Sequence, residues 1–226
     1  MQLAKSHLDV GLFTNARDAQ LSFWQASIGL TFDHLGKLGG GVHQLRHHMN
    51  GSILKINHVR DPLGASPRSG LAGLRIARDG LTQVRRLADP DGNAVTLVPA
   101  GDDAVVGIGL DLEVNDLEAS TRFYAHVMQY EPVAPGVLRA GDTMLFLRTA
   151  RAPVPRPAYR APGFRYTTVQ IHDCDREHAG MLARGGEEGR PPRTIGTTTR
   201  YSFVRDPDGN WIEISHRFEL TGDAPR

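Results

Sequence analysis

The sequence predicts an α+β protein assembled from repeated βαβββ modules, and three observations carry this prediction. The string Asp-Pro-Asp-Gly-Asn occurs at 89–93 and again at 206–210. Each copy precedes a segment that alternates apolar and polar residues, as a half-buried strand does. Two further segments, 7–14 and 108–116, alternate in the same way, and each is followed by a helical pattern. Because such a unit cannot cover its own apolar face, the repeats must pack against one another.

The second copy of the repeated string has the composition of a tight turn followed by a strand. Its proline fixes φ, its glycine supplies a left-handed residue, and its Asp and Asn side chains cap the turn. In the strand that follows, Ile212 and Ile214 share one face, and Trp211, Glu213 and Ser215 share the other. We therefore expect Glu213 on the open face of a sheet whose opposite face packs into a core.

The four modules follow one another along the chain. The first has its expected elements at 7–14, 16–28, 32–38, 42–49 and 52–58. The second has strands at 71–77 and 83–87 before the turn, and the ten residues between Arg78 and Asp89 leave no room for a helix. The third has a strand at 108–116, a helix at 117–130 and strands at 137–139 and 144–147. The fourth has a strand at 166–173 and a helix at 176–184, and it ends in the second turn and its strand.

The division into domains follows from the same repeat. The chain of 226 residues splits naturally into two units of about 100 residues. We expect a first domain at 1–100, shortened in its second half, and a second at 105–217. The proline-rich segment 153–162 lacks the amide donors of a central strand and is predicted to be a loop.

Composition and charge exclude several classes of partner. The formal net charge is only +1, so nothing favours nucleic acid or an anionic membrane. The first ten residues include Lys5, His7 and Asp9 and do not form the apolar core of a signal peptide. Cys174 is the only cysteine, which agrees with a reducing compartment. We expect a cytoplasmic protein, monomeric or homodimeric, whose partner is a small molecule.

The repeated modules and the recurring DPDGN turn make the chain similar to the vicinal oxygen chelate superfamily, which includes glyoxalase I, bleomycin resistance proteins and extradiol dioxygenases. The resemblance covers about residues 5 to 217. It implies that paired modules curl into two cup-shaped half-barrel sheets with helices on the outside. It also implies that ligands come from the start of a module's first strand and from its last strand.

Matching the family's ligand positions to this sequence concentrates the reactive side chains in one cup. If the first module pairs with the fourth, as in the swapped members of the family, one cup collects His7, Lys55, Tyr166 and Glu213. The other cup is then degenerate, because it holds only Leu71, Thr96, Gly109 and Phe146. This asymmetry favours the pairing of the first module with the fourth.

The resemblance also implies one divalent metal ion, Fe, Mn, Ni or Zn, with His7 and Glu213 as its ligands. Two matched ligands are fewer than the three protein groups of an ordinary catalytic site. His43, His47, His48 and His58 are alternative ligands on the later strands of the first module. A protein without metal is the other alternative, in which Glu213 is the general base and Lys55 or Tyr166 stabilises a developing oxyanion. An ion pair between Glu213 and Lys55 without catalysis explains the same residues.

Three further residues are candidates for substrate binding. Asn57 shares a strand face with Lys55, Trp211 flanks Glu213 and offers a surface for a flat ligand, and His43 lies on a neighbouring strand. Two functions remain open. The protein is either a lyase, isomerase or ring-cleaving dioxygenase of the glyoxalase kind, or a non-catalytic binding protein like the bleomycin resistance members.

Overall fold

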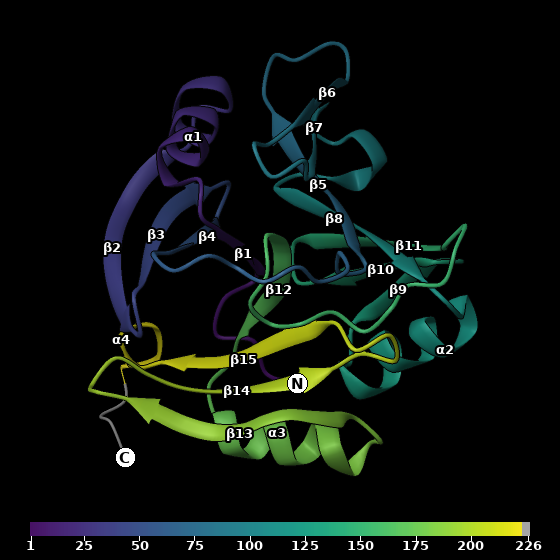
Figure 1. The fold of residues 1–226 in the computed structure, drawn as a ribbon. Coiled ribbons are helices and arrows are strands. Elements are labelled where there is room, and N and C mark those ends of the chain that lie inside the picture. The colour runs from purple at the N-terminus through teal and green to yellow at the C-terminus, as the bar shows by residue number, and fades with distance from the viewer. Residues whose placement is uncertain (223–226) are drawn as a thin grey trace.

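The computed structural model describes residues 1–222 and contains two curled sheets with helices outside them (Figure 1). This agrees with the predicted α+β architecture of paired modules. In the eight-stranded sheet the order is β13-β14-β15-β12-β1-β4-β3-β2. Its strands are β1 (Asp9–Thr14), β2 (Thr31–Gly39), β3 (Val42–Met49), β4 (Ser52–Val59), β12 (Gly163–Gln170), β13 (Glu187–Ile195), β14 (Thr199–Arg205) and β15 (Trp211–Arg217).

The seven-stranded sheet has the order β6-β7-β5-β8-β11-β10-β9. Its strands are β5 (Leu71–Arg78), β6 (Arg85–Ala88), β7 (Ala94–Pro99), β8 (Ile108–Val114), β9 (Glu131–Ala134), β10 (Val137–Ala140) and β11 (Thr143–Thr149). The first module therefore shares a sheet with the fourth, and the second shares one with the third. The strand order confirms the pairing that the distribution of reactive side chains favoured. The division at about residue 100 stays a prediction, since each sheet takes one module from either side of it.

Both sheets are built in the same way around a central antiparallel pair. β1 runs antiparallel to β12 and parallel to β4, while β12 runs parallel to β15. β5 and β8 form the corresponding pair in the other sheet. The apolar faces of these strands meet in one buried core, which takes Val10 and Leu12 from β1 and Ile212 and Ile214 from β15. The alternation seen in the sequence thus separates a core face from an open face in each sheet.

The helices lie where the sequence predicts them. The first is α1 (Arg17–Leu21), which continues as the π-helical turn η1 (Ser22–Ser27). The third module repeats this as α2 (Leu117–Arg122) and η3 (Phe123–Val127). The fourth has α3 (Cys174–Ala183). The described chain has no helix between β5 and β6, as expected for the shortened second module. Two short helical segments were not predicted, namely η2 (Asp102–Ala104) and α4 (Phe218–Thr221).

Two edge strands were also missed from the sequence. β13 contains Pro191 and Pro192, and its register with β14 shifts twice. Proline is tolerated there because an edge strand needs no partner on its outer side. β9 is short, exposed and likewise at an edge of its sheet. Neither segment buries one face, so neither shows the alternation that identifies a strand.

Each of the two DPDGN turns is hydrogen-bonded to the helix of another module, and we call each of these contacts a clamp. Asp206 accepts hydrogen bonds from the backbone N–H of Asp208 and Asn210 and from the amide of Asn210, at 2.8 to 3.0 Å. Its fourth donor is the hydroxyl of Tyr124, on the helix of the third module, at 2.9 Å. Asp89 repeats this arrangement with Gln20 of the first module as its partner. The repeated string therefore joins the helix of one module to the last turn of another.

Because the Asp206 carboxyl of the second clamp is buried, we predict that the free energy of unfolding depends on pH. Desolvation raises the pKa of Asp206 from 3.8 to about 6, although the hydrogen bonds from Asn210 and Tyr124 oppose this shift. Between these values the folded state holds a proton that the unfolded chain has released, so the free energy of unfolding should fall as the pH rises. The loss through this window should be about 3 kcal/mol. Urea unfolding of the wild type and of Asp206→Asn at several pH values measures it. Equal pH slopes for the two proteins would contradict the prediction.

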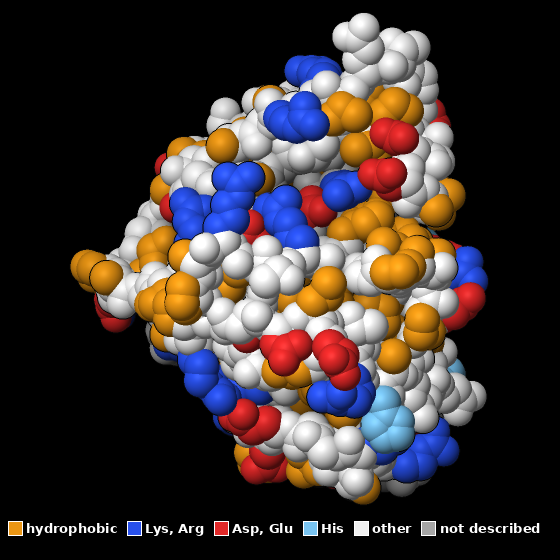
Figure 2. All heavy atoms as spheres, turned by 90° about the vertical axis from the view of Figure 1, so that its right-hand side faces the viewer, with side chains coloured by type: hydrophobic (Ala, Val, Ile, Leu, Met, Phe, Trp, Pro, Cys, Tyr) orange, Lys and Arg blue, Asp and Glu red, His pale blue; other side chains and the backbone are white. Residues whose placement is uncertain are grey.

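The surface carries charge of both signs. Figure 2 shows one face of the molecule, on which Lys and Arg side chains lie among Asp, Glu and hydrophobic side chains. In the part of the chain that the structure describes, no helix has the length and apolar character needed to span a membrane.

Candidate functional site

The concave face of the eight-stranded sheet, which we call the first cup, holds a cavity of about 610 Å³. Its walls come from the hairpin β2–β3 on one side and from β13, β14 and β15 on the other. Three of the four residues predicted for this cup, Lys55, Tyr166 and Glu213, line the cavity. They come from β4, β12 and β15, which the sheet order places on either side of β1.

Lys55, Thr168 and Glu213 form a compact triad. The ammonium of Lys55 donates to Glu213 Oε2 and to Thr168 Oγ1, both at 2.7 Å. The hydroxyl of Thr168 donates in turn to Glu213 Oε2 at 2.7 Å. No described residue donates a hydrogen bond to Glu213 Oε1. One carboxylate oxygen is therefore fixed, and the other is free to meet a ligand in the cavity.

Tyr166 is held as a neutral phenol. Its hydroxyl accepts a hydrogen bond from Asn57 Nδ2 at 3.1 Å, and Gln44 Nε2 lies 3.5 Å away. Burial, and then the proximity of Tyr159 and Glu213, raise the pKa of Tyr166 well above its ordinary value. No described residue accepts its proton. Tyr166 can therefore donate a hydrogen bond to a ligand oxygen.

The ammonium of Lys55 is almost entirely removed from solvent, with a side chain only 4% exposed. Burial lowers the pKa of Lys55, and the negative charges of Glu213 and Asp9 partly offset this effect. Asp9 is itself fully buried. Desolvation alone would raise the pKa of Asp9, but Lys55 and Lys5 lower it below its ordinary value. The floor of the first cup is thus a network of buried charges that compensate one another.

The strand registers show which residue of the first module corresponds to Tyr166. Gly11 lies beside Lys55, and Thr168 lies beside Glu213. If Lys55 is equivalent to Glu213, then Gly11 is equivalent to Thr168, and Asp9 is equivalent to Tyr166. The antiparallel pairs Asp9–Thr168 and Gly11–Tyr166 agree with this two-fold relation. The position at the opening of the first module therefore belongs to Asp9, not to His7.

The assignment of His7 to the cup is corrected by its position. His7 precedes β1 and does not line the cavity. Its imidazole lies against Gly51 and Gly107, and its Nε2 is 3.7 Å from Asp142, a residue of the loop between β10 and β11. His7 and Asp9 are two residues apart, so the alternation of the sequence assigns both to the same face and cannot distinguish them.

Three predicted binding residues are placed differently from one another. His43 is exposed and shares its strand face with Leu45, which packs into the core, so it points away from the cup. Asn57 is fully buried and acts on the cup through two residues, the hydroxyl of Tyr166, to which it donates, and the amide of Gln44, from which it accepts. Trp211 is 7% exposed and lies beneath Tyr159, with ring centroids 5.2 Å apart. Neither Asn57 nor Trp211 is on the cavity wall.

Sequence reasoning missed three residues of the first cup. Thr168 completes the triad and follows Tyr166 on the same face of β12. Arg46 lies on the cavity-facing side of β3 with Val42 and Gln44. The two-residue alternation of that strand would have identified it as a residue of the cup. Tyr159 comes from the predicted loop at 153–162 and joins Phe13, Tyr166, Phe203 and Trp211 in one aromatic cluster. No periodic signal could have placed a loop residue in the cup.

The side chains at the family's ligand positions do not fit a divalent metal. They are Asp9, Lys55, Tyr166 and Glu213, of which only the two carboxylates are common metal ligands. The carboxylate of Asp9 already accepts from Lys5, from the amide of Gln170 and from the backbone of Ile53. Glu213 is bound to the ammonium of Lys55. Within residues 1–222 no group of three or more His, Cys, Asp or Glu side chains is arranged to hold a metal ion.

The corresponding hollow of the other sheet is filled by protein. Val105, between β7 and β8, is fully buried against Ala77, Val98 and Met144. Arg75 pairs with Asp111 at 2.6 Å, and its guanidinium lies 3.9 Å from the ring centroid of Phe146. The two-fold register also moves the opening position of the second module from Leu71, which is in the core, to Gly73. The sequence placed Leu71, Thr96, Gly109 and Phe146 at the ligand positions of this cup, and no reactive side chain among them.

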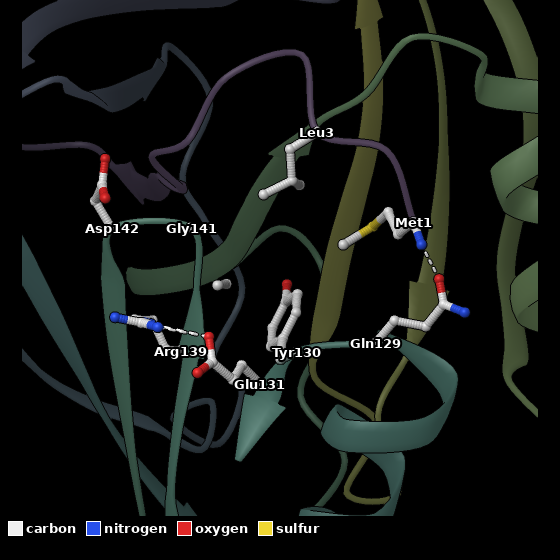
Figure 3. Close-up of a pocket in the computed structure, with 9 residues that line it drawn as sticks. Met1, Leu3, Gln129, Tyr130, Glu131, Arg139, Gly141 and Asp142 are labelled. Atoms are coloured by element: carbon white, nitrogen blue, oxygen red, sulfur yellow. Dashed lines mark hydrogen bonds and ion pairs between the residues drawn. The ribbon is translucent and has the colours of Figure 1, made fainter. Parts of the chain in front are cut away.

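A second hollow, of about 440 Å³, lies where the first residues of the chain cross β9 and β10 (Figure 3). Arg139 pairs with Glu131 at 2.6 Å, and the amino group of Met1 contacts the side chain of Gln129. Figure 3 shows that Arg139, Glu131 and the amino group of Met1 thus have partners within the protein. We assign no ligand to this hollow.

Comparisons with known proteins agree with this architecture. Residues 108–214 match the family model of the Glyoxalase/Bleomycin resistance protein/Dioxygenase superfamily. Glyoxalase I from Zea mays superposes with a TM-score of 0.71 at 14% identity, over 93% of this chain and 92% of that one. A putative dioxygenase from Bacillus subtilis gives a TM-score of 0.72 at 12% identity, over 96% and 86%. A comparison with curated proteins finds no match.

These identities are low enough that the structural matches show only the fold, whereas the family model identifies the second half of the chain. Residues 108–214 therefore belong to the glyoxalase, bleomycin resistance protein and dioxygenase superfamily, and the whole chain has the paired-module fold of glyoxalase I.

Proposed function

We propose that the protein is a metal-independent lyase or isomerase that removes a proton from a carbon next to the carbonyl of an oxygenated small molecule bound in the first cup. Glu213 is the general base, and its free Oε1 takes the proton. The observation that supports this role is the fixed orientation of its carboxylate, whose Oε2 is held at 2.7 Å by both Lys55 and Thr168. A positioned base is worth about 10²- to 10⁴-fold in rate.

The oxyanion formed by this proton transfer needs stabilisation, and two donors of the cup provide it. Tyr166 is a neutral phenol whose proton has no acceptor among residues 1–222. The ammonium of Lys55 carries the positive charge that a metal ion would otherwise supply. Preorganised donors in a site shielded from water stabilise a developing charge without reorganisation.

The exchange of a carbon-bound proton tests this proposal. The wild-type protein, freed of metals with a chelator, should exchange the α-protons of small hydroxyketones with solvent deuterium, as followed by proton NMR. Glu213→Gln should reduce the rate about 100-fold or more, because a carboxamide cannot accept the proton. Glu118→Gln, which removes an exposed carboxylate on α2, is the matched control and should exchange normally.

The second candidate is a non-catalytic binding protein. The aromatic side chains of Phe13, Tyr159 and Tyr166 favour it, since they pack together on the cavity wall and give it a surface suited to a flat ligand. For a binding protein, ligands should bind in the cup while neither the wild type nor Glu213→Gln exchanges any proton. Exchange that disappears when the chelator is added would contradict the metal-independent mechanism.

A further inference from the structure

The cavity of the first cup is strongly positive. Among residues 1–222, Glu213 is the only carboxylate on its wall, and Lys55 already neutralises it. Six other basic side chains line the cavity, namely Lys37, Arg46, Arg160, Arg190, Arg193 and Arg217. A concave site lined by one sign of charge attracts ligands of the other sign.

Most of these cations have no carboxylate partner in the part of the chain that the structure describes. Arg217 is paired with Glu219 at 2.6 Å. For Lys37, Arg160, Arg190 and Arg193, no ion pair is found among residues 1–222. Their charge is therefore available at the mouth of the cup.

Arg46 is the buried member of the set. Its side chain is 7% exposed, and its one ion-pair contact is a long one, 3.5 Å from Nε to Asp33. No described residue accepts a hydrogen bond from its two terminal nitrogens. A buried charge normally has close partners, because leaving it without them is costly. The arrangement leaves the planar fork of Arg46, which suits a carboxylate or phosphate, for a ligand.

Arg190 is held at the mouth by the aromatic cluster. Its guanidinium lies 4.3 Å from the ring centroid of Tyr159 and 5.3 Å from that of Trp211. Stacking on ring faces leaves the N–H donors at the edge of the guanidinium free. A flat apolar wall and free guanidinium donors thus occur in the same cavity.

We propose that the ligand of the first cup is a flat anion, an aromatic ring carrying a carboxylate or an equivalent oxyanion, with its charge bound by Arg46 and Arg190 and its ring against Tyr159 and Tyr166. This inference rests on the proposed function, because it concerns the ligand of the same cup. It excludes neutral and cationic aromatic molecules as the preferred ligands.

Two probes of similar shape test it by isothermal titration calorimetry with the full-length protein. 2-Naphthoate carries the anionic group, and 2-naphthol, neutral at neutral pH, lacks it. The wild type should bind 2-naphthoate about tenfold or more tightly than 2-naphthol, since hydrogen bonds between charged groups are the strong ones. Arg46→Gln should remove most of this preference and leave the affinity for 2-naphthol unchanged.

Arg190→Gln provides a second variant whose folding is not in question, because the substituted side chain is exposed on an edge strand. This substitution should weaken the binding of 2-naphthoate severalfold. Arg86→Gln is the matched control, since it removes one exposed charge from β6 of the other sheet and should change neither affinity. The proposal would be overturned if the wild type bound the two probes equally tightly or bound neither. It would also be overturned if Arg86→Gln lost as much affinity for 2-naphthoate as Arg190→Gln. The proton exchange that depends on Glu213 is measured with other compounds, so its failure is recognised separately.

Discussion

Replacing Lys55 by Met should lower the free energy of unfolding by about 3–5 kcal/mol, the range found when one partner of a buried ion pair is removed. The Lys55 side chain is 4% exposed, and its ammonium donates to Glu213 and Thr168 at 2.7 Å. Without it, the carboxylate of Glu213 keeps only the hydroxyl of Thr168, and the buried charge of Asp9 loses a favourable neighbour. Urea unfolding followed by circular dichroism measures the effect.

A double-mutant cycle separates the ion pair from the loss of packing. Lys55→Met combined with Glu213→Leu should recover much of the stability, because no unpaired charge then remains on the Glu213 side of the triad. Arg148→Met is the matched control, since Arg148 pairs with Glu113 between adjacent parallel strands of the other sheet, with a side chain 63% exposed. That exposed pair should contribute less than about 1 kcal/mol. Similar losses in Lys55→Met and Arg148→Met would show that the buried network does not stabilise the fold.

The Lys55–Glu213 pair shows why much of the site could be predicted from the sequence. Alternation along β15 assigned Glu213 to the open face and Ile212 and Ile214 to the core, as the structure has them. Two-residue periodicity reports which face a side chain occupies. The pairing of the first module with the fourth followed from the concentration of reactive side chains, and the strand order agrees with it.

The same periodicity explains why some site residues were predicted wrongly. A shift of two residues preserves the face, so the pattern could not choose between His7 and Asp9, and only the register with β12 and β4 distinguishes them. A face alone also does not place a residue in a cavity, because Trp211 lies on the correct face but beneath Tyr159. Tyr159 belongs to a loop, whose position depends on tertiary packing rather than on local pattern. The strand β13, which brings Arg190 and Arg193 to the cup, was missed because its prolines and polar residues resemble a loop.

Gly11 should be the least replaceable glycine of the first cup, although no motif in the sequence marks it. A Cβ at this position would lie 2.1 to 2.6 Å from three ring atoms of Tyr166, which is impossible without displacing the ring. The ring cannot move freely, because Phe13 and Tyr159 pack beside it and Asn57 holds its hydroxyl. Gly11 thus provides the space that keeps Tyr166 in the cup.

Gly11→Ala should therefore lower the free energy of unfolding by about 1–3 kcal/mol, the usual effect of overpacking. It should also abolish proton exchange and weaken the binding of 2-naphthoate, since the Tyr166 hydroxyl leaves its position. Gly36→Ala is the matched control, because Gly36 also lines the cavity on a strand but a Cβ there would meet no atom closer than 3.9 Å. A Gly11→Ala protein as stable and as active as Gly36→Ala would contradict the placement of Tyr166 over Gly11. Combining Gly11→Ala with Tyr166→Ala should remove the clash between the new methyl group and the ring. The double variant should therefore lose less free energy of unfolding than the sum of the losses in the two single variants.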